Sequence, residues 1–169
     1  PPNIVTTKQF EEKGGEKFKS DFEEIVRKYT QEFIQLENNI FITHAGMAPD
    51  FWRAIIQGDE FNKKMKNTMM FGEADYNRTF EHKGQLYPFR TYDWKEAVPD
   101  GVILFVGHDP APLTGKPDFD NFQKQPLDYT NNNGGRIIWL DCGAGKGGNL
   151  YGAVVNSTNK NVEQLVNFS

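Results

Sequence analysis

The sequence predicts an α/β protein in which a mixed sheet is flanked by helices. Two short, largely apolar runs, at residues 40–43 and 102–106, are each followed within two residues by a histidine, which is typical of buried strands that end at a turn. Segments between and around these runs space their apolar residues three and four apart, as helices do. With 169 residues, of which 37% are hydrophobic, we expect a single domain over residues 1–169, with residues 1–15 loosely ordered.

The N-terminal half of the sequence predicts three helices and one strand. Apolar residues recur at helical spacing over residues 16–36, and two asparagines then separate this helix from the strand at 40–43. A proline–aspartate pair begins a second helix over residues 50–56. Asp59 is expected to cap a third helix, which ends near residue 70.

The C-terminal half predicts a loop-rich region and a closing hairpin. Residues 71–100 are mixed in character and contain several turn signals, including Pro88. The second strand leads into residues 110–133, a long loop rich in Pro, Asp, Asn and Gln, and loops of this length are usually functional or mobile. We expect a final β-hairpin with strands at 136–140 and 150–155.

Composition excludes several classes of function. The net charge of −4 gives no electrostatic basis for nonspecific binding of nucleic acid. No apolar stretch approaches the roughly 18–20 residues of a membrane-spanning helix, so we expect no membrane partner. The single Cys142 excludes an internal disulfide and a cysteine-rich zinc site, and we expect it to be a buried structural thiol. No secretory signal is visible, so we expect a cytoplasmic protein.

The two histidines at the strand ends are the strongest functional signal. His44 and His108 each follow a predicted strand, and ligands gather beyond the carboxyl ends of strands in open α/β sheets. Because neutral imidazole is the commonest metal ligand, the pair predicts a metal site. The alternative is that both histidines cap core strands and hydrogen-bond locally. Asp109 and Asp141 could add a carboxylate ligand at the same edge, whereas His82 lies in a charged stretch and is expected at the surface.

A longer pattern surrounds this pair. His-Ala-Gly follows the first strand, Pro88, Arg90 and Trp94 fit a P-x-R-x-x-x-W stretch, and Val-Gly-His ends the second strand. In this order the chain resembles the C-terminal half of the calcineurin-like metallophosphoesterases. The nearest branch contains the protein-serine/threonine phosphatases, the diadenosine-tetraphosphate hydrolases and the bacterial polynucleotide phosphatase domain. The resemblance implies that His44 and His108 bind one of two divalent metal ions (Mn, Zn, Fe or Mg) and that Arg90 holds the substrate phosphate.

The resemblance spans about residues 20–155. Within this range, residues 140–150 are similar to the family's closing I-D-T-G…G-G-x-L segment. The family's N-terminal signatures, Asp-x-His, Gly-Asp-x-x-Asp-Arg-Gly and Gly-Asn-His, do not occur in this sequence. In the family they supply the other metal ligands, the bridging aspartate and the general acid. The resemblance therefore implies one half of the family's two-sheet sandwich, whose other half could be another chain, a removed N-terminal region or a separate gene product. We expect a complementary chain or self-association as a partner.

Two further segments have ordinary structural explanations. The glycine-rich residues 143–148 lack the G-x-x-x-x-G-K spacing and the following helix of a phosphate-binding loop, so a hairpin turn is favoured. The aromatic cluster of Tyr87, Phe89, Tyr92 and Trp94 could stack a nucleobase, although packing in the core is the commoner role of such residues.

Two functions are consistent with these observations. The first is a metal-dependent phosphoester hydrolase, whose substrate is a phosphorylated protein, a nucleotide or a nucleic-acid end. The second is a catalytically incomplete remnant that acts as a binding or assembly module, with the loop at 110–133 contacting a partner. Uptake of a divalent metal by the chain distinguishes the two, because a catalytic site must hold its ion.

Overall fold

The computed structural model divides the chain into two compact units, residues 1–31 and 32–169. The residues that it describes are 15–29, 31–36, 39–116, 121–156, 158–159 and 161–168. Except for Gly15, the segment expected to be loosely ordered, residues 1–15, lies outside the described residues, and the expected single domain stays a prediction. No helix in the described part of the chain is long and apolar enough to cross a membrane.

The first unit contains the helix α2 (Gly15–Tyr29). A helix is confirmed here, but its expected extent over residues 16–36 is wrong, because Phe33–Leu36 form strand β1 in the second unit. β1 pairs antiparallel with β2 (Ile40–Thr43), and the ring of Phe33 packs edge-on against two aromatic rings. Apolar residues three apart fit a helix or a short strand, and here pairing with β2 decides for the strand.

The central sheet has five strands in the order β1-β2-β5-β7-β6. β2, β5 (Ile103–Val106) and β7 (Arg136–Trp139) run parallel, whereas β1 and β6 (Leu127–Thr130) pair antiparallel at the two edges. This mixed sheet confirms the predicted α/β class and both expected apolar strands, β2 and β5. β6 corrects the expected loop over residues 110–133, because four residues of alternating exposure carry little periodic signal.

Helices α3 (Asp50–Gln57) and α4 (Lys63–Phe71) pack on one face of the sheet. α3 has nearly its expected bounds. α4 begins later than expected because its N-cap is Asn62 and not Asp59: the Asn62 side chain accepts a hydrogen bond from the Met65 amide at 3.0 Å. The core on this face includes Trp94 from the short 3₁₀ helix η1 (Asp93–Ala97), together with Phe41, Met47, Phe51, Trp52, Met69, Leu104, Ile137 and Trp139.

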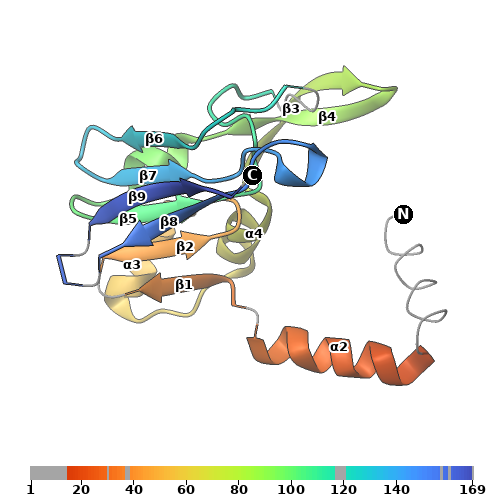
Figure 1. Ribbon diagram of the computed structural model, residues 1–169, viewed down its shortest axis with the longest axis horizontal. Helices are drawn as coiled ribbons and strands as arrows, with labels where there is room; N and C mark the ends of the chain where they lie inside the picture. The colour runs from red at the N-terminus through yellow and green to blue at the C-terminus, as the bar shows by residue number, and fades with distance from the viewer. Residues whose placement is uncertain are drawn as a thin grey trace. The chain divides into compact units, whose positions relative to one another are not determined.

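The other face is covered by a hairpin of β8 (Tyr151–Val155) and β9 (Val162–Asn167) (Figure 1). The expected hairpin between residues 136–140 and 150–155 is wrong, because β7 already has β5 and β6 on its two edges and β8 pairs with β9. The side chains in this second core are Ile40, Ile103, Phe105 and Ile138 of the sheet, with Ala153, Val155, Val162 and Leu165 of the hairpin against them.

A second hairpin, of β3 (Glu73–His82) and β4 (Gln85–Thr91), forms a separate two-stranded sheet. Pro88, expected at a turn, lies inside β4. The register between the strands shifts between Asp75 and Thr79, and Thr79 is the partner of Pro88. A proline has no amide to donate to a ladder, so its position beside this bulge explains how the strand accommodates it.

Candidate functional site

The candidate site lies where β2 and β5 end. The two strands are parallel and pair Thr43 with Val106, so their carboxyl ends lie at the same edge of the sheet. Just beyond, the amide of Gly107 donates to the carbonyl of His44 at 2.9 Å. His44 Nε2 then lies 3.0 Å from His108 Nδ1. The structure therefore brings the two histidines together, as the strand ends predicted.

A tight turn and small residues shape the backbone around this pair. His108 has a φ of +66°, in the left-handed region, which turns the chain sharply after β5. After β2, the amide of Ala45 donates to the carbonyl of Met69 at 2.8 Å. A Cβ at Gly46 would lie 3.1 Å from the indole of the buried Trp94. The small residues of His-Ala-Gly thus let the end of β2 pack closely on α4 and η1.

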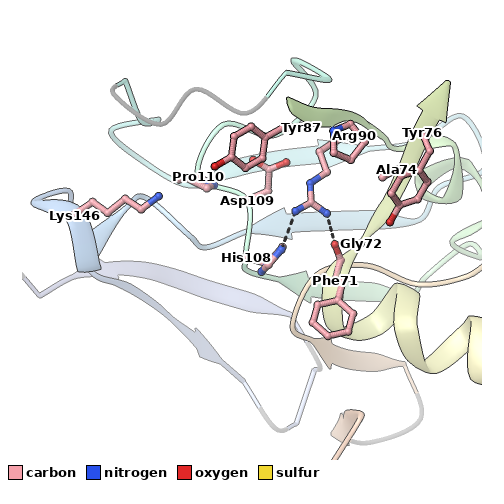
Figure 2. Close-up of a pocket in the computed structure, with 11 residues that line it drawn as sticks. Phe71, Gly72, Ala74, Tyr76, Tyr87, Arg90, His108, Asp109, Pro110 and Lys146 are labelled. Atoms are coloured by element: carbon pink, nitrogen blue, oxygen red, sulfur yellow. Dashed lines mark hydrogen bonds between the residues drawn. The ribbon is translucent and has the colours of Figure 1, made fainter. Parts of the chain in front are cut away.

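Arg90 joins the pair from β4. Its Nη2 lies 3.0 Å from His108 Nε2, and its Nη1 donates to the carbonyl of Phe71 (Figure 2). The Arg90 amide also donates to the carbonyl of Gly115 at 2.6 Å, which fastens β4 to the loop after β5. Among the described residues, the guanidinium hydrogen-bonds only to this carbonyl and this imidazole. A partly buried cation with no carboxylate partner there is suited to binding an anion.

These contacts determine the tautomers of the two imidazoles. A guanidinium only donates, so His108 Nε2 accepts from Arg90. Neutral His108 then carries its proton on Nδ1 and donates to His44 Nε2. Burial lowers the pKa of His108 most, the positive charge of Arg90 lowers it further, and the neighbouring His44 side chain adds to the shift. The charges of Asp109 and Asp141 oppose this shift of the pKa. The neutral imidazole favoured in this way is the form that binds metals.

Asp109 has a structural role and is not available as the carboxylate ligand considered from the sequence. It is 6% exposed, and its carboxylate accepts from the hydroxyl of Tyr92 and, at 3.1 Å, from the amide of Ala111. Burial and then the charge of Asp109 raise the pKa of Tyr92 well above its usual value, so Tyr92 remains a donor. Asp141 likewise accepts from the amide of Gly143 at 2.8 Å. Both carboxylates hold turns at this edge of the sheet.

The spacing of the histidine pair can be compared with that of two ligands on one metal ion. In a tetrahedral zinc site, bonds of about 2.0–2.1 Å place two nitrogen ligands about 3.3 Å apart. The separation of His44 Nε2 and His108 Nδ1, 3.0 Å, is close to this distance. Among the described residues, no group of three or more His, Cys, Asp or Glu side chains could hold a metal. The described residues therefore offer two imidazole nitrogens, which here share a hydrogen bond, and no third ligand.

A pocket of about 520 Å³ lies beside this cluster (Figure 2). Its polar and aromatic lining includes Arg90, His108, Tyr76, Tyr87 and Lys146. Tyr76 and Lys146 were missed by the sequence-based prediction. No sequence signal marks Tyr76. Lys146 belongs to the glycine-rich turn, for which the sequence favoured a hairpin turn over a phosphate-binding loop. That turn forms a 3₁₀ helix of three residues, η2 (Ala144–Lys146), and the next element is the strand β8.

The other residues singled out from the sequence have different surroundings. Cys142 is 1% exposed, which confirms a buried thiol, and burial raises its pKa. Trp94 belongs to the core, while Phe89 packs edge-on against Phe80 with ring centroids 5.5 Å apart. His82 lies in β3, partly buried, and does not line the pocket.

Comparisons with protein-family models, with curated proteins and with solved structures found no match for this chain. The resemblance to the metallophosphoesterases therefore rests on the motifs of the sequence alone and stays a prediction.

Proposed function

We propose that this chain forms the part of a divalent-metal-dependent phosphoester hydrolase site that holds one metal ion and the substrate phosphate. The observation that supports this most strongly is the convergence of His44, His108 and Arg90 from three separate segments, through contacts of 3.0 Å. Two imidazoles and one guanidinium combine the ligands for an ion with a donor for phosphate.

Each of these residues has a distinct role in the proposed site. His44 Nε2 and His108 Nδ1 hold the metal, and Arg90 donates to the phosphate oxygens. A bound divalent ion supplies Lewis acidity and a hydroxide nucleophile at neutral pH. An imidazole that coordinates through Nδ1 carries its proton on Nε2, which then no longer accepts from Arg90. The guanidinium is thereby released for phosphate.

The remaining features of the proposal concern what completes the site. The other ligands come from outside the described residues, since these supply no third ligand: from the missing N-terminal part of the domain, from a complementary chain or from a second copy of this one. The ion is Mn, Zn, Fe or Mg, and the substrate is a phosphorylated protein, a nucleotide or a nucleic-acid end. A cytoplasmic location is part of the proposal and agrees with the single cysteine.

A second candidate function is binding or assembly without catalysis. The lack of a group of three ligands among the described residues favours it. In this role the histidine pair stays hydrogen-bonded, and Arg90 and its pocket bind a phosphorylated partner that is not hydrolysed.

Metal analysis tests the proposed hydrolase site. The wild type, His44→Ala and His108→Ala are each incubated with Mn²⁺ or Zn²⁺ and freed of excess ion. The metal content of each protein is then measured by elemental mass spectrometry. His82→Ala is the matched control, because it removes the third histidine without touching the site. We expect the wild type and the control to retain metal. Each site variant loses about tenfold or more in affinity, because even outer-shell partners of a ligand contribute that much.

The possible results separate the two functions. Equal metal content in all four proteins contradicts the ligand assignment. Metal uptake that depends on His44 and His108, with hydrolysis of p-nitrophenyl phosphate, supports the hydrolase. No retained metal in the wild type supports the binding module, in which the histidine pair stays hydrogen-bonded.

A further inference from the structure

The pocket beside Arg90 has more aromatic surface than a phosphate site requires. Figure 2 shows Tyr76 and Tyr87 on the two sides of the Arg90 side chain, and all three residues come from the β3–β4 hairpin. The volume of about 520 Å³ falls within the range of about 300–1,000 Å³ that is typical of small-molecule sites. The pocket therefore has room for a ligand larger than a phosphate group.

A bulge positions Tyr76. The β3–β4 register shifts between Asp75 and Thr79, so residues 76–78 bulge out of the strand pairing. The amide of Asn77 donates to the Asp75 carboxylate at 3.0 Å within this bulge. Bulges re-aim side chains and occur next to active sites. Tyr76 is 80% exposed, so its ring contributes little to the core and lines the pocket.

Tyr87 presents a ring that is supported from behind. Its ring stacks on Phe80, with centroids 5.9 Å apart and an interplanar angle of 27°. Its hydroxyl donates to Gln85 Oε1 at 2.8 Å. Phe80 is itself 9% exposed and packs on Phe89. A ring held in one orientation in this way is a platform on which another planar group can stack.

The cationic side chains lie in the same pocket as these rings. Arg90 comes from β4 and Lys146 from η2, and both line the pocket. The nearby carboxylate of Asp109 is already engaged by Tyr92 and by a backbone amide. The ligand that matches this lining has an anionic group joined to a planar aromatic group.

We propose that the pocket binds a nucleoside phosphate, with the phosphate at Arg90 and the base stacked on Tyr76 and Tyr87. This inference rests on the proposed function and narrows its substrate to a nucleotide. A phosphoserine side chain offers no planar group to either ring, and an aryl phosphate offers a single ring that is smaller than a purine and is joined directly to the phosphate. Because every base has a stacking face, the pocket discriminates weakly among bases.

A binding experiment with the full chain tests this ligand class. The ¹⁵N-labelled protein is titrated in EDTA with adenosine 5′-monophosphate, with ribose 5-phosphate, which lacks the base, and with phenyl phosphate, while amide shifts are followed by NMR. We expect the adenosine nucleotide to bind about tenfold more tightly than ribose 5-phosphate, since stacking of one base contributes about that factor. Arg90→Met weakens the binding of both.

Variants assign the difference to the two rings. Tyr76→Ala and Tyr87→Ala are expected to reduce the preference for the nucleotide over ribose 5-phosphate about fivefold or more. Leu86→Ala is the matched control, because Leu86 is 71% exposed on the same hairpin and does not line the pocket. Tyr87→Phe keeps the ring and the preference, which separates stacking from a loss of hairpin structure.

Three results overturn the inference: equal affinity for the nucleotide and ribose 5-phosphate, phenyl phosphate binding as tightly as the nucleotide, or a preference unchanged in Tyr76→Ala and Tyr87→Ala. The proposed function fails separately. A nucleotide preference that persists while metal content is independent of His44 and His108 leaves the nucleoside site standing and removes the metal assignment. Phosphate binding at Arg90 with no contribution from the base, together with metal content that depends on His44 and His108, removes the nucleoside site and leaves the metal assignment standing.

Discussion

At the scale of single residues, one hydrogen bond makes two states of the site mutually exclusive. Arg90 donates to Nε2 of His108, and this nitrogen cannot accept a hydrogen bond while it carries a proton. Coordination through Nδ1 requires that proton on Nε2. Arg90 in its present position and a metal on His108 therefore oppose each other.

Replacing Arg90 with methionine removes this opposition, together with a nearby positive charge. We expect Arg90→Met to bind Zn²⁺ about tenfold more tightly than the wild type in a competition titration with a chromophoric chelator. This factor corresponds to one hydrogen bond to a charged group, about 1.5 kcal/mol. Arg78→Met is the control, since Arg78 lies over the ring of Phe89 on the same hairpin. Unchanged or weaker binding in Arg90→Met contradicts the opposition.

The pKa of His108 predicts how stability depends on pH in the metal-free protein. Burial, Arg90 and His44 lower this pKa below 6.5, so as the pH falls the unfolded chain takes up the proton first. Protonation then favours unfolding. The contribution of the neutral His108 side chain to the free energy of unfolding is lost as the pH falls from about 6.5 to the lower pKa of the folded state. We expect urea unfolding in EDTA to show this loss in the wild type and a smaller one in His108→Gln. Equal losses in the two proteins contradict the prediction.

At the scale of elements, the sequence predicts the pieces whose signal lies within their own residues. β2, β5 and α3 have apolar runs or helix signals that are independent of their partners. β1, β6 and β9 could not be predicted, because they have four to six residues each and are defined by the strand beside them. A short strand takes its identity from its neighbour.

The candidate site divides in the same way. His44, His108 and Arg90 were predicted because each belongs to a local motif that keeps its spacing in the sequence. The contribution of Tyr76 depends on a bulge that no sequence signal marks, and that of Lys146 depends on how the glycine-rich turn folds. Backbone irregularities thus place the residues that were missed.

The turn between β6 and β7 leaves no room for a side chain at Gly135, where a Cβ would lie 2.4 Å from the carbonyl oxygen of Val98. The side chain of the buried Asn131 links Gly135 to Val98. It accepts a hydrogen bond from the Gly135 amide at 2.8 Å and donates one to the Val98 carbonyl at 2.9 Å. We expect Gly135→Ala to lower the free energy of unfolding by about 1–3 kcal/mol in urea titrations. Gly145→Ala, with no atom within 4 Å of its Cβ, is the control and changes stability by less than about 0.5 kcal/mol.

At the scale of the whole sheet-containing unit, one sheet separates two cores. Adjacent residues of β7, Ile137 and Ile138, are both 0% exposed, but Ile137 belongs to the helix-covered face and Ile138 to the face under β8 and β9. Because successive side chains of a strand point to opposite faces, this one strand links the two cores.

This arrangement predicts that the two cores unfold together. We expect Ile137→Ala and Ile138→Ala each to lower the free energy of unfolding by about 2–5 kcal/mol, because each leaves a cavity in a packed core. Tryptophan fluorescence and far-ultraviolet circular dichroism give coincident transitions in both variants. Val154→Ala, at a position that is 44% exposed on β8, is the control and costs much less. Separate transitions in Ile138→Ala mean that the β8–β9 face unfolds independently.

The backbone hydrogen bond between Gly107 and His44 has a consequence for ion selectivity in the proposed site. It fixes the 3.0 Å spacing of the two ring nitrogens through two neighbouring strands, and a metal ion needs Arg90 to release His108 first. This spacing matches the short bonds of borderline ions such as Zn²⁺. Ca²⁺, with oxygen ligands at about 2.3–2.6 Å, is disfavoured by both the spacing and the nitrogen donors. We therefore expect the proposed site to favour Zn²⁺ over Ca²⁺.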